Sequence, residues 1–202
     1  MSRLRTALAA AIALVLPLPV LADTAPPTNI PAGHYVLDPR HSTLIARVKH
    51  MNVSLYTMRF DTIAASFDYN PDRPEATRLE ASVDPASLDV DNPKTTAEFT
   101  EEFLKVSQFP KATFVSTSAQ ATGPGHGTIT GDLTLMGVTK PVTFDVTLIG
   151  EGHEVMPWPA GRRAAGFEAT TTFKRSDFGS TFLDNLVGDE ITLQIEAEFE
   201  HK

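Results

Sequence analysis

Ile191-Thr192-Leu193-Gln194-Ile195-Glu196-Ala197-Glu198-Phe199 is a stretch in which apolar and polar side chains alternate without a break. A period of two residues is typical of a β-strand, because successive side chains on a strand point to opposite faces of the sheet. One face of this strand therefore carries carboxylates toward water, and the other presents aliphatic and aromatic groups to an interior. When several such strands close into a ring, their inner faces surround either a packed core or a cavity, and that difference decides what the protein does.

The same alternation recurs along the chain and predicts eight strands. The expected strands cover residues 35–50, 57–69, 77–83, 113–119, 128–136, 142–149, 166–174 and 191–201. Turn-forming residues separate them, such as Asn70-Pro71-Asp72 and the glycine-rich segment 123–127. Short connections of this kind imply that neighbouring strands are antiparallel.

One segment departs from the strand pattern. Thr95-Thr96-Ala97-Glu98 matches a capping box, and Phe99 and Phe103 follow with the four-residue spacing of a helix face. We therefore expect a short amphipathic helix over residues 97–106 that closes one end of the sheet. Because closure removes the exposed edges of a sheet, the pattern favours an all-β, eight-stranded antiparallel barrel, with a β-sandwich as the alternative.

The N-terminal 22 residues are typical of a secretory signal peptide rather than of a folded domain. Arg3 and Arg5 precede an apolar run over residues 7–20, and the small residue Ala22 follows. This run is too short for a comfortable membrane span, and no other apolar stretch approaches the roughly 20 residues that a span needs. We expect a signal peptide at 1–22, an extended leader at 23–33 and one barrel domain at 34–202. The mature chain would have no transmembrane segment and would lie in the periplasm.

The composition excludes several classes of function. The chain contains no cysteine, which rules out disulfides, thiolate metal sites and cysteine nucleophiles. It has 17 basic and 25 acidic residues, and cleavage of the predicted signal peptide would remove two of the basic ones. Such an acidic balance argues against binding to nucleic acid or to anionic lipid surfaces.

Two polar residues stand out because the strand pattern places each beside an apolar row. His50 ends the inward row of residues 44–48, where it either forms hydrogen bonds at the barrel rim or contacts a ligand headgroup. Arg175 closes the seventh strand, where it either forms a rim salt bridge in a turn stabilised by Asp177 or meets an anionic or carbonyl oxygen. The remaining histidines show no metal-ligand spacing, and we expect no metal site and no catalytic residue.

Five blocks of the sequence together resemble the YceI-like family. They are Tyr-Val-Leu-Asp-Pro-Arg-His-Ser at 35–42, Phe-Pro-Lys-Ala-Thr-Phe at 109–114, Gly-Asp-Leu-Thr-Leu-Met-Gly-Val-Thr-Lys-Pro-Val at 131–142, Ala-Gly-Phe-Glu-Ala at 165–169 and Arg-Ser-Asp-Phe-Gly at 175–179. The resemblance implies a lipocalin-like barrel with one short helix between its third and fourth strands. It also implies an exported protein whose interior binds a long polyisoprenoid, such as a quinone tail or a polyprenyl chain, and no cofactor other than that lipid.

Strand periodicity within this barrel assigns the ligand-binding interior. The predicted lining residues are Leu44, Ala46, Val48, Phe60, Leu133, Leu135, Phe144, Val146, Phe167, Phe173, Leu193 and Ile195, with His50 and Arg175 near the end of the interior. Several positions depart from the family pattern: Ala46 replaces a frequent large aromatic, Met58 replaces a common glycine, and residues 94–98 replace a block with a charged residue and a histidine, so the headgroup preference of the family is not carried over. We expect Ala46 to enlarge the interior and Met58 to refill part of it.

The leading hypothesis is a non-catalytic, exported carrier of a polyisoprenoid or quinone-like lipid. Two alternatives stay open. In one, the protein is an enzyme acting on the bound lipid, with His50 as acid or base and Lys140 or Arg175 polarising an oxygen. In the other, it is a stress-related periplasmic interaction protein with a fully packed barrel. A homodimer is compatible with each hypothesis.

Overall fold

The computed structural model describes residues 30–153 and 163–202. Within these ranges the chain forms eleven β-strands, one α-helix and four short 3-10 turns. The strands are β1 (Gly33–Leu37), β2 (Thr43–His50), β3 (Ser54–Phe60), β4 (Ile63–Tyr69), β5 (Arg78–Val83), β6 (Leu88–Asp89), β7 (Ala112–Gly123), β8 (His126–Leu135), β9 (Val138–His153), β10 (Arg163–Lys174) and β11 (Val187–His201). The helix is α1 (Pro93–Glu102), and the turns are η1 (Pro39–His41), η2 (Pro74–Ala76), η3 (Pro85–Ser87) and η4 (Arg175–Phe178).

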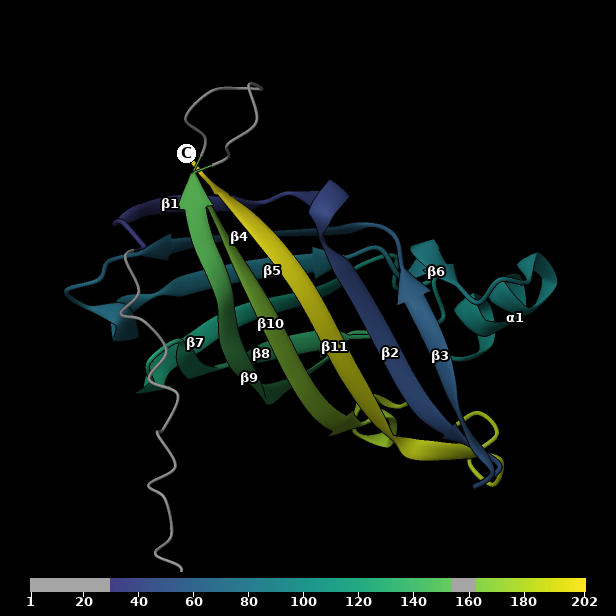
Figure 1. Ribbon diagram of the computed structural model, residues 1–202. Coiled ribbons are helices and arrows are strands. Elements are labelled where there is room, and N and C mark those ends of the chain that lie inside the picture. Colours follow the sequence, from purple (N-terminus) through teal and green to yellow (C-terminus); the bar gives the residue numbers. More distant parts are fainter. Residues whose placement is uncertain (1–29, 154–162) are drawn as a thin grey trace, which may run out of the picture.

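The strands close into a single antiparallel barrel (Figure 1). Neighbours follow the order β1-β4-β5-β7-β8-β9-β10-β11, and β11 pairs back to β1. The three remaining strands extend this ring, because β2 pairs with β11 and β3, and β6 pairs with β3. The pairs β1/β2, β3/β4 and β5/β6 are therefore each one interrupted strand. The eleven segments amount to eight strands in an up-and-down order, and the predicted eight-stranded barrel is confirmed.

Proline and aspartate explain two of the interruptions. The predicted run 35–50 breaks at η1, where Pro39 lacks a backbone N–H and the Asp38 carboxylate accepts from the N–H of Arg40 at 2.9 Å. The same chemistry recurs at η3, where Asp84 caps the turn that begins at Pro85. The expectation of an unbroken strand over 35–50 was therefore wrong, although β1 and β2 on either side of η1 both pair with β11.

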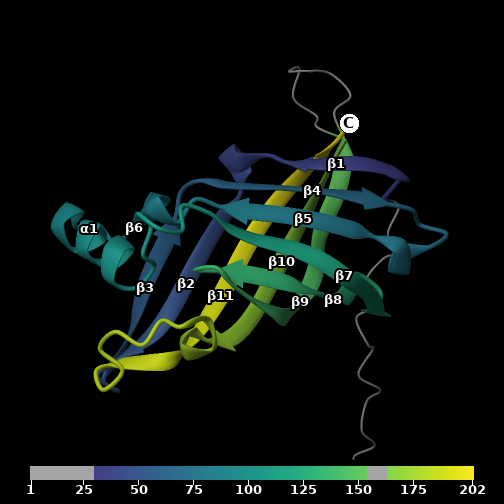
Figure 2. The same cartoon turned by 180° about the vertical axis from the view of Figure 1, so that it is seen from behind.

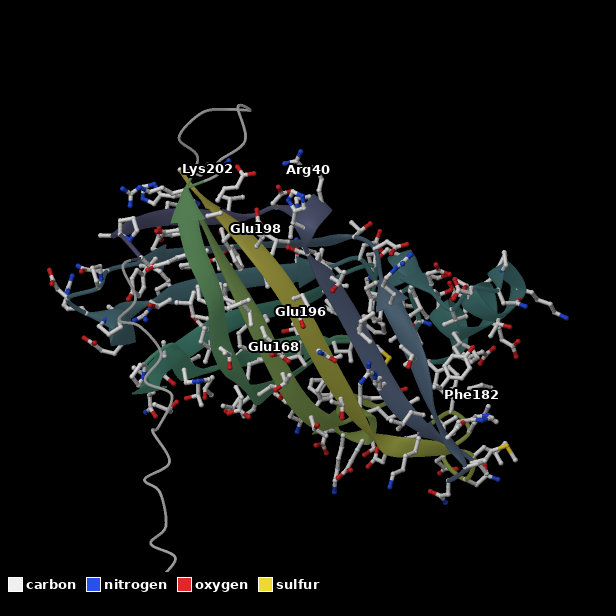
Figure 3. All side chains as sticks on the ribbon, in the orientation of Figure 1. Arg40, Glu168, Phe182, Glu196, Glu198 and Lys202 are labelled. Carbon is white, nitrogen blue, oxygen red and sulfur yellow. The ribbon has the colours of Figure 1, made fainter. Side chains whose placement is uncertain are left out.

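The alternation of β11 sorts its side chains as expected. Leu193 and Ile195 lie on the inner face, whereas Glu196 is exposed and lies opposite Glu168 of β10 on the outer face. Figure 3 shows both carboxylates on the outside of the wall. A cluster of buried residues around Tyr35, including Phe67, Ala165 and Phe199, packs one end of the interior, and a second cluster around Phe114 and Phe178 packs another part of it.

The helix α1 lies beside β3 and β6, at one end of the barrel (Figures 1 and 2). It begins and ends four residues earlier than predicted. The start differs because Asn92 is the N-cap and accepts from the N–H of Thr95 at 3.1 Å, with Pro93 in the first turn. The predicted capping box at 95–98 was therefore wrong. The prediction that the helix closes one end of the sheet is consistent with its contacts, since the Phe99 ring packs against Tyr56 and the Phe103 ring against Phe182.

The predicted signal peptide at 1–22 and most of the predicted leader at 23–33 lie outside the described residues. The last leader residues are described, and they contact the barrel: Ile30 is buried in the cluster around Tyr35, and the Tyr35 hydroxyl donates to the carbonyl of Pro31 at 2.9 Å. Among the described residues, no helix has both the length and the apolar character needed to cross a bilayer.

Candidate binding site in the barrel lumen

The interior of the barrel is hollow. It holds one cavity of about 350 Å³, here cavity 1, and another of about 190 Å³, here cavity 2. The two cavities adjoin, because five residues line both of them. These are Leu44, Val83, Ala112, Leu133 and Leu193. Together the cavities fall within the range of roughly 300–1,000 Å³ that is usual for small-molecule sites.

The five residues that line both cavities are here called the waist. Cavity 1 extends from the waist toward the β7–β8 turn. Aromatic and aliphatic side chains from β4, β5, β8, β9, β10 and β11 form its wall, and the polar groups at its far end include His126 and Gln120. Cavity 2 extends the other way, beneath α1 and the loop between η4 and β11. Neither cavity has an aspartate or glutamate in its described lining. The lumen is therefore suited to hydrocarbon and unsuited to a cationic ligand.

All fourteen residues predicted for the interior line these cavities. Phe144, Val146, Phe167 and Ile195 line cavity 1; Ala46, Val48, His50, Phe60, Leu135, Phe173 and Arg175 line cavity 2; and Leu44, Leu133 and Leu193 line both. Their contact with a lipid remains a prediction. The hollow lumen is evidence against the alternative of a fully packed barrel.

Sequence reasoning missed much of the wall contributed by β4. Phe60 of β3 points inward, so strict alternation would place residues 62, 64 and 66 on the inner face. The interruption between β3 and β4 changes the phase by one residue, and Ile63, Ala65 and Phe67 pack into the core instead. The residues missed in cavity 2 include Tyr56, Phe99 and Leu104. The four-residue spacing of Phe99 and Phe103 was the signal that could have placed the helix over the lumen.

His50 lies where cavity 2 meets the surface. Its side chain lines the cavity, yet the residue is exposed. Its ring lies 6.2 Å from the ring of Tyr56, which in turn packs against Phe99 at 5.5 Å. His50 thus stands beside an aromatic wall at a mouth of the lumen, as the predicted position near one end requires.

Arg175 is buried at the same end, and its guanidinium binds backbone carbonyls rather than a carboxylate. Nε donates to Gly188 at 3.0 Å, Nη1 donates to Ser180 and Phe182 at 2.9 Å each, and Nη2 donates to Val187 at 3.0 Å. The guanidinium carbon lies 5.8 Å from the centre of the Phe103 ring. One of the two Nη2 hydrogens has no partner among the described residues. The cation thus organises the 179–188 loop and borders cavity 2.

The interpretation of Arg175 as part of a rim salt bridge was wrong. The carboxylate that stabilises the turn is Asp189, which accepts from the N–H and the hydroxyl of Ser176 at 3.0 and 2.9 Å. The backbone hydrogen bond from Ser176 holds the pKa of Asp189 below its usual value. Lys140 is exposed on β9 and lines neither cavity, so it is not placed to polarise a ligand in the lumen.

Asp38, His41 and Glu198 form a separate cluster outside the lumen, with potential ligand atoms within 4.8 Å of one another. Both oxygens of the buried Asp38 carboxylate already accept from Arg40, at 3.1 and 2.7 Å, and His41 Nδ1 lies 3.1 Å from one of them. Figure 3 shows Arg40 and Glu198 at this outer corner. The cluster ties the bend between β1 and β2 to β11, which is a structural role.

Comparison with known proteins agrees with this geometry. The model of the YceI-like domain matches residues 35–199. A UPF0312 protein of Shewanella sp. (strain W3-18-1) is 36% identical over 156 residues, which cover 76% of this chain and 80% of that protein.

Solved structures show the same barrel. Burkholderia cenocepacia BcnA superposes with a TM-score of 0.70 at 23% identity, covering 80% of this chain and 98% of that one. A Campylobacter jejuni YCEI protein gives 0.66 at 26% identity, covering 76% and 90%. A Saccharophagus degradans domain, described as a polyisoprenoid binding domain implicated in plant cell wall breakdown, gives 0.59 at 15% identity, covering 83% and 98%.

Proposed function

Because this chain belongs to the YceI-like family, we propose that it is an exported, non-catalytic carrier that holds a long polyisoprenoid lipid in its lumen. The observation that carries the proposal is the pair of adjoining apolar cavities, which form an elongated space instead of one round pocket. The similar domain of Saccharophagus degradans, named for polyisoprenoid binding, supports the class of ligand.

Burial of hydrocarbon supplies the affinity in this proposal. Each methylene-sized group transferred from water contributes about 0.8 kcal/mol before the cost of ordering the chain. A ligand that reaches through the waist at Leu44 and Leu193 uses both cavities, whereas a short ligand uses one. Affinity should therefore rise with prenyl chain length until the lumen is filled.

Arg175 is the group that would meet the polar end of the ligand. Arg175 lines cavity 2, and its remaining Nη2 hydrogen would donate to a quinone carbonyl, a hydroxyl or a phosphate oxygen placed there. The four carbonyls that hold the guanidinium fix its position in advance, so little side-chain entropy is lost on binding. A headgroup at this end would leave the prenyl chain to run past the waist into cavity 1.

Binding alone explains the lumen better than catalysis does. His50 is the titratable imidazole in cavity 2, and no carboxylate of the described lining stands beside it to orient it or to share a proton. The lipid is therefore carried unchanged. Export to the periplasm rests on the predicted signal peptide, and N-terminal sequencing of protein from the native host should begin at Asp23.

The test is to identify and exchange the bound lipid. Native mass spectrometry of purified protein should show an isoprenoid at one per chain, and stripped protein should rebind prenyl alcohols and quinones more tightly as the chain lengthens. The His50→Ala variant should leave a bound quinone chemically unchanged, as the wild type does. Protein that carries no lipid in repeated preparations, and binds short and long chains equally poorly, would contradict the proposal.

A further inference from the structure

The exposed apolar side chains of the described residues gather at one end of the barrel. Seven large hydrophobic residues are exposed in the described part of the chain, and five of them belong to two neighbouring loops. These five, here called the apolar tip, are Met51, Val53 and Leu55 of the β2–β3 hairpin and Leu183 and Leu186 of the 179–188 loop. Isolated exposed hydrophobic residues are ordinary, but a cluster of this kind indicates an interaction surface.

The two loops of the apolar tip are fixed against each other. The N–H of Met51 donates to the carbonyl of Leu186 at 2.7 Å, and His50 pairs with Val187 across the adjoining strands. Both views of the barrel show the hairpin and the loop side by side at the end nearest α1 (Figures 1 and 2). The carbonyls held by Arg175 belong to the same loop. The tip is therefore preorganised.

The apolar tip is continuous with the lumen. His50 and Tyr56, which flank the hairpin tip in sequence, both line cavity 2, and so does Val187, the residue after Leu186. A hydrocarbon chain that leaves the cavity at His50 thus passes directly onto exposed aliphatic side chains.

The charge of the hairpin differs from that of the rest of the chain. Residues 43–60 contain no aspartate or glutamate but carry Arg47, Lys49 and Arg59, in a protein of formal net charge −8. Arg47 and Lys49 are exposed, whereas Arg59 pairs with Asp61 and Asp89. The net charge argues against anionic lipid surfaces for the molecule as a whole. Within the apolar tip the hairpin carries this positive charge, whereas Asp184 of the neighbouring loop is exposed, so electrostatics would admit an anionic bilayer only where the hairpin meets it.

We propose that the apolar tip docks on a phospholipid bilayer, with Met51, Val53 and Leu55 entering the interfacial region and Arg47 and Lys49 facing anionic headgroups. The docked orientation places the mouth of cavity 2 against the hydrocarbon region, so a prenyl chain moves between membrane and lumen without crossing water. The docking rests on the tip alone; its role in lipid transfer rests on the proposed function.

The experiment measures binding of the full chain to large unilamellar vesicles by co-sedimentation. One set contains phosphatidylcholine only, and the other contains phosphatidylcholine with phosphatidylglycerol. The variant is Leu55→Asp, and its matched control is Ile149→Asp, because the two residues lie on strands and are exposed to nearly the same extent, 61% and 63%. Neither residue lines a cavity.

The wild type should bind the anionic vesicles more strongly than the phosphatidylcholine vesicles. Leu55→Asp should lower the partition coefficient at least tenfold, and Ile149→Asp should leave it within twofold of wild type. Both variants should still bind a prenyl alcohol dispersed in detergent, which separates loss of docking from failure of the lumen to bind lipid.

Three outcomes would overturn the proposal. The first is wild-type protein that does not sediment with either kind of vesicle, or that binds both kinds equally. The second is an equal loss of binding in Leu55→Asp and Ile149→Asp. The third is a dimer, detected by sedimentation equilibrium, that Leu55→Asp dissociates while vesicle binding is unchanged, because a second copy of the chain would then cover the tip.

Discussion

Filling cavity 2 from Ala46 should shorten the lipid that the protein can hold. Ala46 is buried on the inner face of β2, lies between Met58 and Leu193 in neighbouring strands, and lines cavity 2. The Ala46→Phe substitution adds a phenyl ring that points into this space next to the waist. Because cavity 2 offers free volume beside Ala46, we expect the barrel to fold normally.

The size of the effect follows from the cavity volume. At roughly 30 Å³ for a group the size of a water molecule, the 190 Å³ of cavity 2 accommodates about six carbon-sized groups, which is the size of a phenyl ring. Burial of that many carbons of a ligand contributes about 5 kcal/mol before ordering costs. If the entropy cost of ordering the chain offsets about two thirds of this, the variant loses about 1.5 kcal/mol of binding free energy, which raises Kd roughly tenfold.

The assay is a titration of stripped protein with prenyl alcohols of increasing length. Ala46→Phe should weaken binding of long chains about tenfold and leave the shortest chains, which can bind in cavity 1 without reaching Arg175, nearly unchanged. The control is Ala86→Phe, since Ala86 is exposed on η3 and lines neither cavity. If Ala46→Phe shows the wild-type dependence on chain length, the two cavities are not a common binding space.

The remaining predictions concern the groups that hold the barrel ends. Arg175→Met should lower the free energy of unfolding, measured by urea titration, by about 3 kcal/mol or more, because it leaves several carbonyls of the 179–188 loop without donors. Arg175→Lys should restore only part of this loss, since an ammonium group cannot reach all of these carbonyls. Tyr35→Phe should cost about 1 kcal/mol at neutral pH through loss of the hydrogen bond to Pro31. Burial raises the pKa of Tyr35 above 10.0, so the wild type should lose this advantage as the pH rises above that value, whereas the variant should show no such loss. The pKa of Asp189 is lowered from 3.8, so its contribution to stability is fully present above pH 3.8 and is lost as the pH falls below that value. Asp189→Asn should therefore lower the urea midpoint at about pH 7, and the difference from the wild type should shrink as the pH falls below 3.8.

The inner wall could be predicted wherever a strand is regular. On β2, β8 and β11 the side of the sheet that a residue faces depends only on whether its position is odd or even, and the assignments at Leu44, Leu133 and Leu193 follow from that local rule. The rule failed between β3 and β4, where a break without a turn motif shifted the phase and moved Phe67 rather than Ser66 to the inside. The start of α1 was misplaced for a similar reason, because Asn92 and Thr95 are both acceptable caps and Pro93 favours the earlier one.

By itself the sequence determined antiparallel strands with an acidic outer face and an apolar inner face, because strand alternation and side-chain polarity are local properties that can be read residue by residue. It favoured a barrel over a sandwich, and the strand pairing in the tertiary structure decided that the sheet closes. Only the tertiary structure decided whether that interior is empty. The free volume depends on how Ala46, Met58 and Leu193 from three neighbouring strands pack against one another. No single segment of the sequence contains all three, so their combined volume cannot be read from one strand. The tertiary structure also decided the partners of Arg175, since the carbonyls that it binds are brought within reach only when the 179–188 loop folds back under α1.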